Sequence, residues 1–174
     1  LTAESQAFIN NSGVNVKPRA AELLFVNIDV EKVPYNRGFY TIDVRFFYRI
    51  TVEASTTIGC PRLLSGLAVF DKRCILFGSE GGARIFSSKF VQDAPDYQRM
   101  QSANKPTAVV EAVEPILLEA KIVEPTYCCG CGCEISSVPA PIGQCFGGED
   151  IALNSDGNRL FVTLGQFSIL RLER

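Results

Sequence analysis

The segment from Phe39 to Ala54, FYTIDVRFFYRITVEA, alternates between two kinds of position along its whole length. Every even-numbered residue is apolar, whereas most odd-numbered residues are charged or carry a hydroxyl group. Because successive side chains of a strand point to opposite faces of a sheet, this period predicts a strand with one buried and one solvent-facing side. Its length is about three times the usual five or six residues, and this constrains the chain to a β fold.

Shorter apolar runs bounded by turn residues predict further strands. They are Glu22–Val30, Leu64–Phe70, Cys74–Phe77, Ala83–Phe86, Ala108–Val113, Ile116–Val123, Gly147–Leu153 and Arg159–Leu172. Turn residues at Pro34–Gly38, Asp71–Arg73 and Asn154–Asn158 predict hairpin connections. We therefore expect an all-β fold without a long helix: an antiparallel β-sandwich of about eight or nine strands, or the same strands closing into a barrel. Residues 21–174 would form this single domain.

Residues 1–20 differ in composition from the rest of the chain and are predicted to form an N-terminal arm. They are polar, and Phe8 and Ile9 are their only pair of bulky apolar residues. One interpretation is a frayed terminus. The other is an arm that docks on a neighbouring subunit through Phe8 and Ile9, because open sheet edges accept an added strand.

Composition excludes several classes of function. The 174 residues carry a net charge of −2 without a basic cluster, so a nucleic-acid partner is not expected. No apolar run reaches the roughly 18 residues that membrane insertion requires. The chain has no histidine, which excludes Ser-His-Asp nucleophile systems and His-ligated zinc. We expect no catalytic residues, no cofactor and no small-molecule substrate.

The cysteines are the main candidate site residues. Four of the seven lie in the segment YCCGCGC at 127–133. The complete set is Cys60, Cys74, Cys128, Cys129, Cys131, Cys133 and Cys145. Buried unreactive thiols are one interpretation, and it suits Cys74, which begins an apolar run. A thioredoxin-like centre would need a helix after the cluster, but the chain runs into Pro139-Ala140-Pro141.

Two further interpretations of the cysteine cluster remain open. A zinc-type metal site could use Cys128, Cys131, Cys133 and Cys145, although zinc ribbons pair two separated C-x-x-C motifs and this chain has one. Disulfide cross-links are the favoured interpretation. Adjacent Cys128 and Cys129 would point in opposite directions from an extended chain, so they could reach two different partners, one of them in a neighbouring subunit.

Several segments resemble a family of uncharacterised, cysteine-containing proteins from spore-forming Firmicutes, chiefly clostridia and their relatives. The residues that carry the resemblance are Ala20–Tyr40, Val69–Lys72, Ile75–Gly81 and Val162–Ile169. The resemblance implies a setting at the cell or spore surface, where cysteine-rich β proteins build coat or appendage layers. It carries over no catalytic residue.

The function expected from the sequence is therefore structural. A β-rich subunit would bind copies of itself through its edge strands and its N-terminal arm, and disulfides would lock the fibre, tube or surface layer that results. The alternative is a structural or sequestering protein that binds a metal through the cysteine cluster. An extracellular location is expected for the structural protein.

Overall fold

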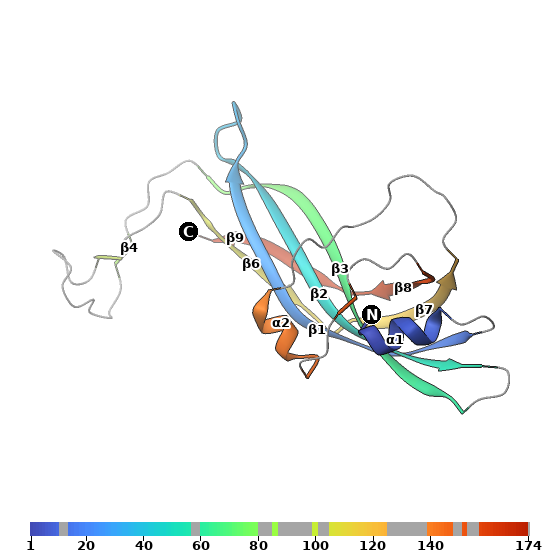
Figure 1. Cartoon of the computed structure of the whole chain (residues 1–174). Helices are drawn as coiled ribbons and strands as arrows, with labels where there is room; N and C mark the ends of the chain where they lie inside the picture. The colour runs from blue at the N-terminus through green and yellow to red at the C-terminus, as the bar shows by residue number, and fades with distance from the viewer. Residues whose placement is uncertain are drawn as a thin grey trace. The chain divides into compact units, whose positions relative to one another are not determined.

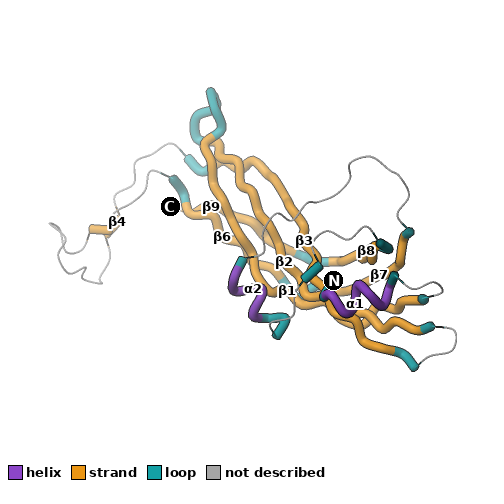
Figure 2. The backbone as a smooth tube through the Cα atoms, viewed as in Figure 1, coloured by secondary structure: helices purple, strands orange, loops and turns teal. Residues whose placement is uncertain are grey.

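The computed structural model of the chain is mostly β, with antiparallel sheets and, among the described residues, two short helices (Figure 2). It describes residues 1–10, 14–56, 60–79, 85–86, 99–100, 105–124, 139–147, 151–152 and 157–173. The helices are α1 (Ala3–Ile9) and α2 (Ala140–Gln144). The strands are β1 (Asn15–Lys32), β2 (Phe39–Ser55), β3 (Arg62–Phe77), β4 (Ile85–Phe86), β5 (Arg99–Met100), β6 (Thr107–Ala112), β7 (Ile116–Val123), β8 (Arg159–Gly165) and β9 (Ser168–Glu173).

Strand β2 confirms the long strand expected from the alternating segment. All of its even-numbered residues from Tyr40 to Ala54 are buried, whereas Phe47 is the one buried residue at an odd-numbered position. Strand β2 lies between β1 and β3 in a three-stranded sheet (Figure 1). Most of the buried apolar side chains of the described residues therefore come from one central strand.

The turn between β1 and β2 lies where the sequence predicts it. Gly38 has a φ of 79°, a left-handed conformation that costs glycine little because it has no Cβ. The Val33 N–H donates to the Phe39 carbonyl across the base of the turn at 3.1 Å. Strand β1 extends beyond the expected Glu22–Val30 at both ends and begins inside the segment predicted to be an arm.

Strand β3 corrects the predicted hairpin at Asp71–Arg73. The chain continues as one strand from Arg62 to Phe77, and these charged residues lie in its middle. Asp71 and Arg73 form ion pairs with Arg45 and Asp43 of β2. The charged run is compatible with a strand because its side chains have partners on the neighbouring strand.

The other sheets have two strands each: β4 with β5, β6 with β9, and β7 with β8. The expected strand Arg159–Leu172 is interrupted at Gln166 and Phe167, and its two halves pair with different strands. In the described residues the strands do not close into a barrel. The expectation of eight or nine strands is also wrong, because seven described strands have six or more residues and β4 and β5 have only two.

The chain forms two compact units, and the three long strands contribute residues to both. Unit 1 comprises Leu1–Val26, Phe46–Phe70 and Ala112–Phe167. Unit 2 comprises Asn27–Arg45, Asp71–Glu111 and Ser168–Arg174.

In unit 1, helix α2 packs over Phe47, the one buried residue at an odd-numbered position of β2. Phe47 forms a cluster with Ile142 and Phe146, and partly buried apolar residues of β1, β3 and the segment at 151 pack against it. Pro141 lies in the first turn of α2, where proline loses no helical hydrogen bond. The prediction that no helix forms at Pro139–Pro141 is therefore wrong, because α2 begins at Ala140.

Neither described helix has the length and apolar character needed to cross a membrane.

Candidate functional site

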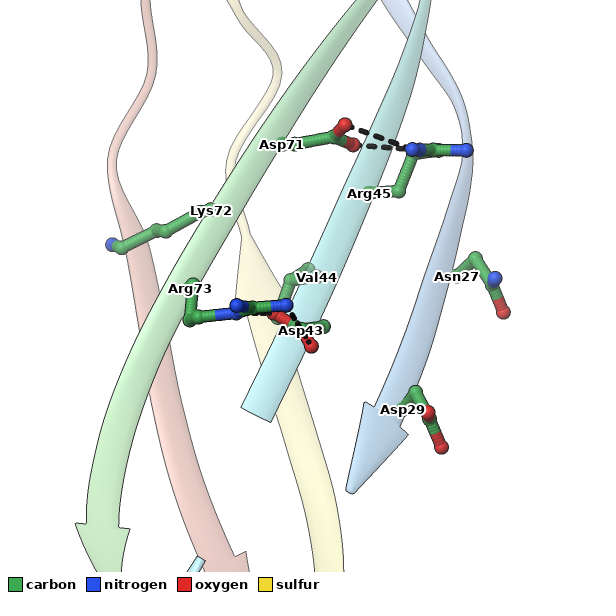
Figure 3. Close-up of a pocket in the computed structure, with 8 residues that line it drawn as sticks. All are labelled: Asn27, Asp29, Asp43, Val44, Arg45, Asp71, Lys72 and Arg73. Atoms are coloured by element: carbon green, nitrogen blue, oxygen red, sulfur yellow. Dashed lines mark hydrogen bonds and ion pairs between the residues drawn. The ribbon is translucent and has the colours of Figure 1, made fainter. Parts of the chain in front are cut away.

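Two ion pairs form a ladder across β2 and β3 in unit 2. The Arg45 guanidinium donates to both carboxylate oxygens of Asp71, with Nε–Oδ1 at 2.6 Å and Nη2–Oδ2 at 2.9 Å. The Arg73 guanidinium binds Asp43 in the same two-bond geometry, at 2.6 and 2.9 Å. Opposite charges thus alternate both along each strand and across the two strands (Figure 3). We call these four residues the charge ladder.

The charge ladder lies in a shallow hollow of about 480 Å³. The hollow is lined by Asn27, Asp29, Asp43, Val44, Arg45, Asp71, Lys72 and Arg73. The hydrogen bonds from Arg73 hold the pKa of Asp43 below its ordinary value. Those from Arg45 do the same for the pKa of Asp71. These carboxylates are therefore ionised at neutral pH, so they are unsuited to act as general acids.

The ladder predicts a pH dependence of stability. Replacing Asp71 with asparagine should lower the free energy of unfolding at neutral pH by at most about 1 kcal/mol, because both partners are exposed. Since Arg45 holds the native pKa of Asp71 below 3.8, the ion pair stabilises the fold above that value and is lost as the pH falls through the native pKa. In urea unfolding, the difference between wild type and Asp71→Asn should therefore shrink as the pH falls below 3.8.

The matched control for this measurement is Asp29→Asn, which removes the same charge from the hollow without breaking a ladder pair. A stability difference between wild type and Asp71→Asn that stays constant into acid would contradict the role given to Arg45.

The three described cysteines lie in different surroundings. Cys60 is exposed just before β3, and Cys145 is exposed at the end of α2, where its carbonyl accepts a hydrogen bond from Arg49 Nη1 at 3.1 Å. Cys74 is half-buried in β3, its Sγ lies 3.9 Å from the Ile42 carbonyl oxygen, and burial raises the pKa of its thiol. Cys60 and Cys74 are not in disulfide bonds. Of these two, Cys60 is the better placed to form a cross-link.

The cluster Cys128, Cys129, Cys131 and Cys133 lies outside the described residues, so the structure does not test its assignment to cross-links or to a metal. In the described part of the chain, no three acidic or cysteine side chains gather as metal ligands would.

The two apolar residues of the predicted arm lie on helix α1. Ile9 is fully buried in its own chain, and the half-buried Phe8 lies under the guanidinium of Arg62, with 5.7 Å from Cζ to the ring centroid. Asn158 fixes the end of the helix, because its Nδ2 donates to the Ile9 carbonyl at 2.8 Å and its own carbonyl accepts from Gln6 Nε2 at 2.8 Å. Docking of this segment on a neighbouring subunit stays a prediction, and any such exchange would first have to break these contacts.

Strand edges form a second group of candidate surfaces. On β1, an edge strand, Glu114 Oε2 accepts from the Leu23 N–H at 3.2 Å and Lys105 Nζ donates to the Val30 carbonyl at 3.0 Å. On β3, the opposite edge strand, the described contacts of this kind occur at Ser65, whose carbonyl and N–H bond to the Thr2 N–H and to Ser5 Oγ. Side chains thus occupy outer backbone groups of β1 at two positions, Leu23 and Val30. On β3, the described bonds of this kind lie near the beginning of the strand, at Ser65.

The charge ladder is the feature that sequence reasoning missed. Its signal is present in the sequence, because Asp43-Val44-Arg45 and Asp71-Lys72-Arg73 have the same order of charges. Two antiparallel strands with this order place unlike charges opposite each other.

Comparisons of the chain with protein-family models, with curated proteins and with solved structures found no match. The fold alone defines the class of protein: a β-rich chain of antiparallel sheets, in which β1 and β3 are the edge strands of the described three-stranded sheet. The resemblance to the family from spore-forming Firmicutes stays a prediction.

Proposed function

We propose that the chain is a non-enzymatic structural subunit that binds copies of itself and builds a fibre, tube or surface layer. In this proposal the sheets stack as a β-sandwich, and disulfides strengthen the assembly at the cell or spore surface. The observation that carries the proposal is the amount of apolar surface left exposed on the strands. Monomeric proteins seldom leave large contiguous apolar patches in water, because such patches promote association.

Fourteen large apolar side chains of the described residues are exposed. They are Phe25, Tyr35, Phe39, Leu63, Phe70, Ile75, Phe77, Val113, Ile116, Leu118, Val123, Phe161, Phe167 and Ile169. None of the 18 residues of β1 is buried, and the same holds for every residue of β6, β7, β8 and β9. Burial is concentrated on β2, so much apolar surface remains for contacts with other copies.

The exposed residues include two groups on different strands. Ile75 and Phe77 lie two residues apart on the same face of the edge strand β3 in unit 2. Ile116, Leu118, Val123 and Phe161 belong to the pair β7–β8. An open assembly needs at least two different contact surfaces per subunit, because a single self-complementary surface closes into a dimer. The two groups supply this minimum.

The proposal predicts that the purified protein forms large species as its concentration rises. Sedimentation velocity and electron microscopy should show fibres, tubes or sheets, and a non-reducing gel should show covalent multimers that a thiol reductant removes. Phe161→Ser should reduce the assembly because it removes an exposed apolar ring from β8. Thr163→Ser, two residues along the same exposed face, should leave the assembly unchanged.

A protein that remains monomeric at every concentration, with and without reductant, would overturn the proposed function. If the Phe161→Ser variant assembles as strongly as the wild type, the β7–β8 surface is not a contact surface of the assembly.

A further inference from the structure

Among the residues that the structure describes, the part of β3 from Asp71 to Phe77 in unit 2 forms the edge of its sheet. In the described sheet, β3 has β2 on one side and no strand on the other. At Ser65 the carbonyl and the N–H both bond to residues near the start of the chain, which marks the backbone groups of Ser65 as facing outward. Because backbone groups of one edge recur at every second residue, those of Asp71 and Arg73 face outward as well.

The side chains of the same two residues form the outer column of the charge ladder. Asp71 and Arg73 lie on the ladder face, each bonded on one side to β2, whereas Lys72 extends from β3 away from them (Figure 3). A carboxylate and a guanidinium each have room for more than one partner. A further strand with the reverse order of charges would therefore continue the alternation.

We propose that β3 pairs antiparallel with β3 of a second copy of the chain around a two-fold axis at Lys72. This contact rests on the proposed function and identifies one of its surfaces. Asp71 then lies opposite Arg73 of the second copy, and Arg73 lies opposite its Asp71. The two three-stranded sheets become one sheet of six strands, and the charge ladder runs across the junction.

The order of charges selects this register among the alternatives. An axis at Asp71 or at Arg73 would place that charged residue opposite its own copy, and like charges facing each other are destabilising. An axis at Phe70 or at Cys74 would place Asp71 and Arg73 opposite apolar residues. The axis at Lys72 pairs both with unlike charges, and it also places the exposed Ile75 opposite Val69 of the second copy.

This register also agrees with the direction of the backbone groups. With the axis at Lys72, Asp71 and Arg73 of the two copies form hydrogen-bonded pairs, which requires their N–H and carbonyl groups to face outward. The two Lys72 residues form the close pair without backbone hydrogen bonds. Their ammonium groups repel each other, and this is the unfavourable contact of the interface.

The Lys72 pair provides a direct test, because only a residue near the axis meets its own copy. The two Cα atoms of such a pair lie about 4.5 Å apart, within the range of about 4.4–6.8 Å seen for disulfides. Lys72→Cys in the full chain should form a covalent dimer under mild oxidation. Mass spectrometry of the digested dimer should find position 72 of one copy joined to position 72 of the other.

Two further variants make the test specific. Lys17→Cys places a thiol at an exposed lysine position on β1, which belongs to neither proposed contact surface, and should give no such self-linked peptide. Lys72→Gln removes the repulsion at the axis and should lower the dissociation constant of the dimer about twofold to fivefold in sedimentation.

The outcomes separate this contact from the proposed function. The expected result is self-linkage of Lys72→Cys together with tighter association of Lys72→Gln. If the wild type assembles but Lys72→Cys does not link to itself, the β3 contact is wrong and the proposed function stands on another surface. If Lys72→Cys links to itself but the wild type goes no further than a dimer, the contact is right and the proposed function is wrong.

Discussion

Replacing Phe47 with alanine should lower the free energy of unfolding by about 3–5 kcal/mol, the usual cost of removing a buried phenylalanine ring. Phe47 is buried against Ile142 and Phe146, which helix α2 and the turn after it place over this face of β2 in unit 1. The variant would leave a cavity between the strand and the helix. Urea unfolding measures the loss of stability, and hydrogen exchange of the α2 amides shows whether the helix detaches.

The matched control for Phe47→Ala is Phe25→Ala. The two rings are neighbours, with centroids 6.1 Å apart, but Phe25 is 40% exposed. Its loss should cost about 1 kcal/mol, because much of the ring is already in contact with water. Equal losses for the two variants would contradict the division between a buried cluster at Phe47 and an exposed surface at Phe25.

The bounds of a strand are predicted best from the sequence where apolar and polar residues alternate within the strand itself. Strand β2 begins at the expected Phe39 and ends one residue beyond the expected Ala54, and β7 spans Ile116–Val123 as expected. In both strands, the pattern of apolar residues within the segment itself indicates the structure. Strand β6 also lies within one residue of its expected ends.

The predicted hairpin turn at Asp71–Arg73 is wrong because the residues that stabilise a strand there lie on β2. Three consecutive charged residues are typical of a turn, and nothing beside them in the sequence contradicts that interpretation. Their ion pairs with Asp43 and Arg45 become visible only when β2 and β3 are aligned in antiparallel register. The charge ladder was missed for the same reason.

The two helices were missed because contacts distant in sequence stabilise them. A helix of one or two turns is unstable alone, because nucleation costs more than the few hydrogen bonds return. Helix α1 is held by the bonds of Asn158 to Gln6 and Ile9, and α2 by the packing of Ile142 against Phe47. Among the candidate cysteines, Cys74 is half-buried in β3, and its interpretation as a buried unreactive thiol stays a prediction.

Replacing Gly78 with alanine should lower the free energy of unfolding by about 1–3 kcal/mol, the usual cost of inserting a methyl group into packed surroundings. Gly78 follows β3 in unit 2, and its N–H donates to the Gly38 carbonyl at 2.8 Å, which fixes the backbone here. A Cβ at this position would lie 2.9 Å from Tyr40, from Pro106 and from Leu172. These atoms approach from three different segments, so no single side-chain rotation relieves the crowding.

The matched control for Gly78→Ala is Gly143→Ala in α2, where an added Cβ meets no atom within 4 Å. Alanine favours the helix over glycine, so this variant should keep its stability or gain up to about 1 kcal/mol. Urea unfolding of the two variants beside the wild type measures both effects. Because Gly78 brings β2, β9 and the residue before β6 together, a Gly78→Ala variant as stable as the wild type would show that these segments do not pack closely at this point.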